Sequence, residues 1–257
     1  MSAPGDSLVL STLEFDVLWE AERLPPPHPA LRVLSPGRTH SERRALVEKA
    51  WASLGERQLA RGTRASADLV DQLNLLAHPK VSIDVWVWAD REIKGLAVSI
   101  GSQALLAVVD RDEVWLIPAR DTSLPESAVS VAGELRAGVG RSVSVPHRIV
   151  LAADADAQGD PKALVTALED RKVELWQAQE LAGMMVGTTA RGQFGVERLG
   201  RDGSMHRGGR VVAFHDTDAG RYLVQLGTGA DGQDWVTVAP ADNQLLATRI
   251  WELLEEV

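Results

Sequence analysis

The sequence predicts an α+β fold built on an antiparallel sheet. Apolar residues recur at helical spacing in some segments and alternate with polar residues in others, and the turns between the alternating segments are short. The same order of helices followed by strands occurs in each half of the 257-residue chain. We therefore expect a pseudo-twofold molecule with a central antiparallel β-sheet.

Helices are expected first in the N-terminal half. A capping box of Ser11 with Glu14 predicts a short helix from residue 12, and a second box of Thr39 with Glu42 predicts a helix that reaches about residue 60. Gly62 is expected just past the end of that second helix. A third amphipathic helix is predicted over 66–77.

Strands follow the helices. Val81 to Trp88 alternate apolar and polar side chains, and further strands are expected over 96–100, 105–109 and 114–118. Asp90–Lys94 is predicted to be a polar hairpin loop, and short turns between the later strands indicate antiparallel neighbours. A helix is expected after Pro125.

The second half repeats this order. Asp160 is expected to cap a helix whose first residue is Pro161, and Asp242 to cap the final helix. The other expected elements are a helix over 173–186 and strands over 191–198, 210–215, 221–226 and 235–239. The glycine-bearing stretch Gly133–Gly140 is interpreted as the boundary, giving a single domain over 1–257 with internal halves of about 1–136 and 141–257.

Composition excludes several classes of function. Without cysteine, the chain has no disulfide, no thiol catalyst and no cysteine ligand for zinc. The net charge of −9 disfavours binding to nucleic acid, and no run approaches the ~20 apolar residues that span a bilayer. No N-terminal signal is visible. We therefore expect a cytoplasmic protein with no membrane insertion.

Two short segments resemble cofactor or metal motifs, but neither has the surrounding residues or structure that its motif requires. Gly227–Gly232 matches the dinucleotide fingerprint, but a strand is expected after it where that motif requires a helix N-terminus. Asp216–Gly220 resembles the start of a calcium loop without the bidentate acid, so we interpret it as a tight turn in which Asp216 bonds the backbone and Gly220 takes positive φ. Asp154 and Asp156 lie in an alanine-rich polar stretch and are expected to be solvated.

Two further groups of side chains give no catalytic site. The six histidines are scattered without metal-ligand spacing. A cluster of arginines suggests a basic hairpin that touches phosphate, but a solvated hairpin tip is favoured; its members are Arg198, Arg201, Arg207 and Arg210. We expect no enzyme activity and no cofactor.

A family resemblance rests on an ordered set of short segments. In the second half these are Arg191–Gly195, Asp216–Tyr222 and Trp235–Asp242, and in the first half Pro36–Thr39 and Ser82–Trp86. Together they resemble the EspG family of type VII (ESX) secretion-associated proteins, over nearly the whole chain. The resemblance implies an actinobacterial, cytosolic chaperone that binds the helical tip of the PPE subunit of a PE–PPE heterodimer, keeps it soluble and directs it to the secretion machinery. It also implies an EspG-like α+β fold, in which a pseudo-twofold central antiparallel β-sheet is flanked by two helical bundles.

The resemblance implies partner-binding residues in two places. One is the loop between the long first-half strand and the next, carried here by Asp90, Arg91, Glu92, Ile93 and Lys94. The other is a helix of the C-terminal bundle, carried here by Trp176, Gln177, Glu180, Leu181, Met184 and Met185. A Met–Met pair gives an adaptable apolar surface, whereas a stripe at helical spacing is also what a bundle core requires. If the helix is an interface, Met184→Glu or Leu181→Glu is expected to weaken binding.

Two alternatives come from other classes of protein. One is a nucleotide-binding enzyme that uses the glycine-rich turn 227–232, and the other is a scaffold that self-associates through its sheet or helix faces. The oligomeric state stays open between a monomer and a weak dimer.

Overall fold

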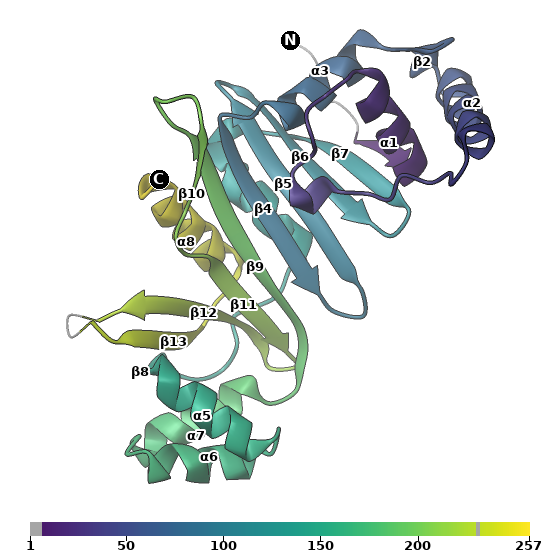
Figure 1. The fold of residues 1–257 in the computed structure, drawn as a ribbon. Coiled ribbons are helices and arrows are strands. Elements are labelled where there is room, and N and C mark those ends of the chain that lie inside the picture. Colours follow the sequence, from purple (N-terminus) through teal and green to yellow (C-terminus); the bar gives the residue numbers. More distant parts are fainter. Residues whose placement is uncertain (1–6, 230–231) are drawn as a thin grey trace. The chain divides into compact units, whose positions relative to one another are not determined.

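The computed structural model describes residues 7–229 and 232–257 (Figure 1). Its α-helices are α1 Thr12–Ala21, α2 His40–Glu56, α3 Ala67–Ala77, α4 Leu124–Val129, α5 His147–Ala157, α6 Pro161–Asp170, α7 Leu175–Met185 and α8 Asn243–Glu255. Its strands are β1 Leu8–Ser11, β2 Ala60–Arg61, β3 Arg64–Ala65, β4 Val81–Trp88, β5 Glu92–Ile100, β6 Gln103–Asp110, β7 Glu113–Ala119, β8 Val143–Pro146, β9 Thr188–Leu199, β10 Met205–Arg207, β11 Val212–Thr217, β12 Gly220–Thr228 and β13 Asp234–Pro240.

The predicted α+β class with a large antiparallel sheet is confirmed. Hydrogen-bonded neighbours follow the order β1-β7-β6-β5-β4-β9-β11-β12-β13-β8, with β10 beside β9 and a separate β2–β3 hairpin. The chain forms two compact units. Unit 1 comprises residues 1–86, 92–131 and 196–207, and unit 2 comprises residues 87–91, 132–195 and 208–257.

Unit 1 packs helices on both faces of its strands. Leu96 and Val98 of β5 lie in a core that also holds apolar side chains from α1, α2 and α3. Ala97, between them in the strand, points to the opposite face and is fully buried. The contacts of α4 with β5 and β6 place that helix on this opposite face. Figure 1 shows α1 and α3 beside these strands.

The predicted end of α2 is wrong by about one turn. The helix ends at Glu56, where the N–H of Arg57 still bonds the carbonyl of Ser53 and Gln58 takes a left-handed φ of 60°. Gly62 does not cap this helix but lies at the turn of the β2–β3 hairpin, with φ 60°. The helix end was misplaced because sequence patterns predict a glycine in the left-handed conformation after a helix, whereas Gln58 takes that conformation here.

Six of the helices and strands given above have weak sequence signals and were not predicted. They are β1, β2, β3, β8, β10 and α5. The five strands are only two to four residues long, too short for a period of two to stand out. In α5, alanines occupy the buried positions Ala153 and Ala157. Asp154 and Asp156 are exposed on this helix, as expected.

The arginine cluster is not a solvated tip throughout. Arg207 reaches the carboxylate of Asp84, whose side chain is only 2% exposed, with an N–O distance of 2.7 Å. It also contacts Glu197 at 3.1 Å. Arg210 instead pairs with Glu256 in unit 2. Opposite charges fixed by the fold therefore neutralise two of these arginines.

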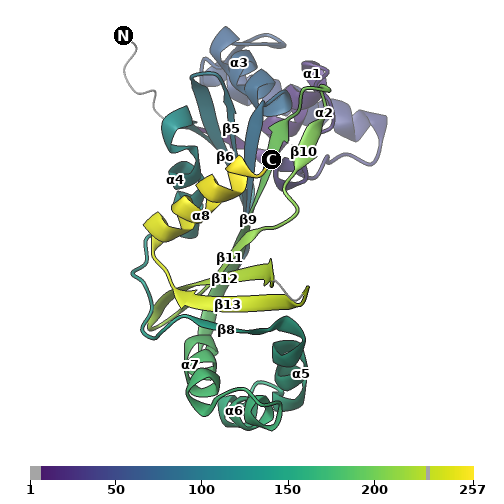
Figure 2. The same ribbon diagram turned by 90° about the vertical axis from the view of Figure 1, so that its left-hand side faces the viewer.

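Unit 2 combines the C-terminal strands with a three-helix bundle. In Figure 2, α5, α6 and α7 lie together beside β8. Their buried side chains share one core with Val143 and Val145 of β8, Val236 and Val238 of β13, and Tyr222 of β12. The final helix, α8, begins at the predicted cap, where Asp242 accepts a hydrogen bond from the N–H of Leu245, and it contacts β11.

The helices of the described chain are short. The longest, α2, has 17 residues, and none of the helices within the described ranges combines the length and apolar character that a membrane span requires.

Candidate partner-binding groove

The predicted site helix α7 has one face in the core and one at the surface. Leu181 and Met184 are each 1% exposed and belong to the core of unit 2. Trp176, by contrast, is 50% exposed. Gln177, Glu180 and Met185 are half-buried. The helix therefore uses its apolar stripe for the bundle, and its tryptophan remains available to a partner.

An open groove of 590 Å³ runs beside the exposed side of α7. We call it the α7 groove; its lining residues are Val139, Gly140, Arg141, Trp176, Gln179, Glu180, Gly183, Met184, Ala219 and Tyr222. Three of the residues predicted on α7 line it, namely Trp176, Glu180 and Met184. Met185 instead lines a 200 Å³ pocket at the end of the bundle, together with Leu164 and Val186.

One wall of the groove is formed by residues 139–141, the end of the segment 132–141, which we call the strap. Gly138 lies directly on the ring of Tyr222, since a Cβ at that position would be 2.1 Å from the ring Cζ. The hydroxyl of Tyr222 donates to the carbonyl of Val139 over 2.9 Å. The N–H of Arg141 bonds the Glu180 carboxylate over 3.1 Å, so the strap is attached both to β12 and to α7.

His215 links the floor of the groove to the other wall. Its Nε2 lies 2.9 Å from the carbonyl oxygen of Met184 near the end of α7, and its ring stacks on Tyr222 with centroids 5.2 Å apart. Because the carbonyl only accepts, Nε2 carries the proton and donates. Burial lowers the pKa of His215, against the opposing effects of the Met184 bond and the charge of Asp216.

The lowered pKa of His215 predicts that acid destabilises unit 2. The unfolded chain, with an ordinary histidine pKa near ~6.5, takes up a proton that the folded chain resists, so stability is present above that value and lost as the pH falls through it. We expect the melting temperature to fall between about pH 7 and pH 5. The dependence should flatten in His215→Gln, whose amide can still donate to Met184. Equal pH slopes in the two proteins would contradict this role.

The predicted loop residues are divided between a connection and a strand. Asp90 and Arg91 lie in the connection after β4, where their side chains pair at 3.1 Å. Glu92, Ile93 and Lys94 belong to β5, with Ile93 opposite Asp110 of β6. The prediction that all five form a loop is therefore wrong for three of them, because the pairing with β6 extends the strand further than its apolar residues indicate.

The strap and the floor of the groove were missed by sequence reasoning. The stretch Gly133–Gly140 was interpreted only as a boundary, and Tyr222, the single tyrosine of the chain, only as the start of a strand. The glycines on either side of Val139 are the signal that was available. Gly138 is required because the backbone approaches the Tyr222 ring closely there, and Gly140 has a positive φ of 133°.

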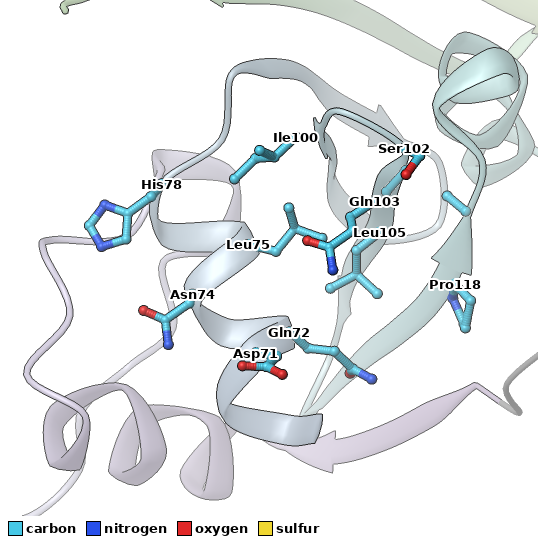
Figure 3. Close-up of a pocket in the computed structure, with 12 residues that line it drawn as sticks. Asp71, Gln72, Asn74, Leu75, His78, Ile100, Ser102, Gln103, Leu105 and Pro118 are labelled. Atoms are coloured by element: carbon cyan, nitrogen blue, oxygen red, sulfur yellow. The ribbon is translucent and has the colours of Figure 1, made fainter. Parts of the chain in front are cut away.

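A larger pocket of 890 Å³ lies in unit 1 between α3 and the ends of β5, β6 and β7 (Figure 3). Leu75, Leu105 and Pro118 give it apolar walls, and Gln72, Asn74 and Gln103 contribute amides. None of the predicted site residues lines it, and Asp71 is its only acidic side chain. The α7 groove is therefore the better candidate for the partner site.

The segments that resemble a dinucleotide site and a calcium loop both lie where strands of unit 2 connect. Within the residues that the structure describes, no group of three histidine, aspartate or glutamate side chains is placed to hold a metal ion. The segment 227–232 joins strands β12 and β13, with Thr228 opposite Asp234, so a strand follows it as predicted. Its residues 230 and 231 lie outside the described residues. Gly220 has the predicted positive φ of 129°, but Asp216 bonds Arg221, not the predicted backbone.

An open groove with an exposed tryptophan is typical of a protein surface that binds another protein. The model of the EspG family matches residues 11–252. The chain belongs to the EspG family.

A solved structure shows the same fold. It contains the Mycobacterium tuberculosis type VII secretion system chaperone EspG5 in complex with a PE25–PPE41 dimer. The similarity has a TM-score of 0.75 at 13% sequence identity and covers 97% of this chain and 96% of that one. No curated protein matches the chain by sequence.

Proposed function

We propose that this protein is a cytoplasmic, non-catalytic chaperone of type VII secretion, which holds the helical tip of the PPE subunit of a PE–PPE dimer. Binding keeps the apolar tip from aggregating and directs the dimer to the secretion machinery. The observation that carries the proposal is the half-exposed Trp176 in the open α7 groove of an EspG-family chain. The complex of EspG5 with PE25–PPE41 supports the choice of partner.

The chemistry of the groove suits an amphipathic tip. Trp176, Val139 and Tyr222 offer apolar contact area, and aromatic anchors contribute strongly to protein interfaces. Arg141 and Gln179 provide polar groups at its edge. The proposed contact also includes the connection Asp90–Arg91 and the start of β5 at Glu92–Lys94.

Co-expression with a PE–PPE dimer tests the function directly. We expect a soluble complex of 1:1:1 stoichiometry in size-exclusion chromatography with light scattering. The PE–PPE pair alone is the control and should aggregate more. Separate elution of the chaperone and the pair at micromolar concentration would contradict the proposal. Homodimers in the scattering data would support the scaffold alternative, and a raised melting temperature with NAD or ATP would support a nucleotide site.

We also infer that the chain arose by duplication, with halves 1–136 and 141–257 forming one EspG-like domain. Each half has three helices, then a run of mainly antiparallel strands, then a single helix: α1–α3, β4–β7 and α4 in one, and α5–α7, β9–β13 and α8 in the other. This common order supports a pseudo-twofold arrangement with a helical bundle on either side. An experimental structure in which no half-turn superposes β4–β7 on the second set of strands would contradict it.

A further inference from the structure

We propose that Arg221 is a positioning residue for the α7 groove, because its side chain and backbone together fix the strap whose end forms one wall. The inference rests on the proposed function, since it assigns a residue that prepares the partner site without contacting the partner. Arg221 is fully buried at the start of β12 and is not among the residues that line the groove.

The side chain of Arg221 uses all five of its N–H donors. Nε and one Nη donate to the two carboxylate oxygens of Asp216 over 2.8 and 2.9 Å. The other donors reach the carbonyls of Ala132 and Gly133, over 2.7 and 3.1 Å, and the Oδ1 of Asn243 at the start of α8. The guanidinium also lies 4.7 Å from the ring centroid of Phe214.

These partners come from separate parts of unit 2. Asp216 is the second-last residue of β11, Asn243 begins α8, and Ala132 and Gly133 begin the strap. The amide of Asn243 adds a second hydrogen bond to the carbonyl of Gly133 over 3.1 Å. A planar, charged fork is the one side chain that satisfies all these acceptors at once.

The backbone of Arg221 holds the next part of the strap. Its N–H donates to the carbonyl of Arg136, and its carbonyl accepts from the N–H of Gly138, each over 2.9 Å. The next residue, Tyr222, holds the following part of the strap. Its ring packs against Gly138, and its hydroxyl donates to the carbonyl of Val139. Adjacent residues of β12 therefore hold the strap from Ala132 to Val139, and the groove wall at 139–141 continues directly from this anchored segment.

The test compares Arg221→Lys with the wild-type chain. Lysine keeps the charge opposite Asp216, but its three donors leave at least two of the five former acceptors without a hydrogen bond from residue 221. We expect amide exchange at Gly138 and Arg141 to accelerate about tenfold, and affinity for the PE–PPE dimer to fall about tenfold, as for the loss of one hydrogen bond to a charged group. Helix α6 should keep its protection.

Two further variants separate positioning from general stability. Asn243→Ala removes the α8 links to Arg221 and Gly133 and should give a smaller effect in the same direction, even if Arg221→Lys fails to fold. Leu253→Ala, a buried residue near the other end of α8, should lower the melting temperature and leave the strap amides and the affinity unchanged.

Each outcome decides a different point. Unchanged strap exchange and affinity in folded Arg221→Lys would overturn the positioning role. If Leu253→Ala and Arg221→Lys had the same melting temperature and lost affinity equally, Arg221 would act only through the stability of the fold. If the wild-type chain itself fails to bind the PE–PPE dimer, the proposed function fails, and the exchange rates at Gly138 and Arg141 still report whether Arg221 fixes the strap.

Discussion

Replacing Trp176 by alanine is expected to weaken binding of the PE–PPE dimer by about thirtyfold or more without unfolding the chaperone. Trp176 is half exposed in the α7 groove, so its loss leaves no cavity in the bundle core. Tryptophans at the centre of an interface typically contribute ~2 kcal/mol or more, which corresponds to that factor. Isothermal titration calorimetry measures the affinity, and circular dichroism checks the fold.

The neighbouring Leu175 is the matched control. It lies on the same helix, is 47% exposed and is not among the residues that line the groove. Leu175→Ala should therefore change the affinity little. A result in which the two variants lose binding equally, or in which Trp176→Ala binds like the wild type, would remove the α7 groove from the interface.

The substitutions suggested by the sequence, Met184→Glu and Leu181→Glu, do not isolate binding. Both side chains are buried in the core of unit 2, so a carboxylate there is expected to destabilise the fold because it must be desolvated without a partner. Weaker binding by either variant would report a damaged bundle. A substitution of the exposed Trp176, in contrast, is expected to change the affinity for the partner without damaging the fold.

Gly138→Ala is expected to destabilise unit 2 by about 1–3 kcal/mol, the usual cost of overpacking. The added methyl group would lie 2.1 Å from the Tyr222 ring, so either the ring or the strap must move and the hydroxyl bond to Val139 is strained. Urea unfolding measures the loss, and partner affinity should fall with it because the end of the strap is a groove wall.

A second substitution identifies the cause. In a Tyr222→Leu background the shorter side chain leaves room for the methyl group, so Gly138→Ala should cost much less, as a double-mutant cycle would show. Gly183→Ala is a control that is expected to raise stability instead of lowering it. Its Cβ would meet nothing within 4 Å in the interior of α7, and it should stabilise the helix by about 0.5–1 kcal/mol. Additive losses for Gly138 and Tyr222 would argue against the clash.

Much of the fold was predictable because its determinants are local. The capping boxes of Ser11 and Thr39 form as predicted, since each needs only side chains three residues apart. Strands such as β4 were found from alternation alone. Short strands and the alanine-rich α5 escaped because their formation depends on pairing and packing with distant residues.

The candidate site was predictable only in part. The resemblance pointed to α7, and Trp176, Glu180 and Met184 do line the groove. Which side of the helix is free was not readable, because one apolar stripe at helical spacing is compatible with a core and with an interface. The structure shows that Leu181 is buried in the bundle core, whereas Trp176 is exposed and free to contact a partner.

Periodicity, capping and ordered short motifs are local features of the chain, so they were sufficient to predict the α+β class, most of the helices and strands, and the resemblance to the EspG family. The fold was needed to show that the Gly133–Gly140 stretch leads into a groove wall and that Arg221 and Tyr222 hold it. Those contacts join residues more than eighty positions apart in sequence, and no local pattern records which distant carbonyl a buried arginine will bind.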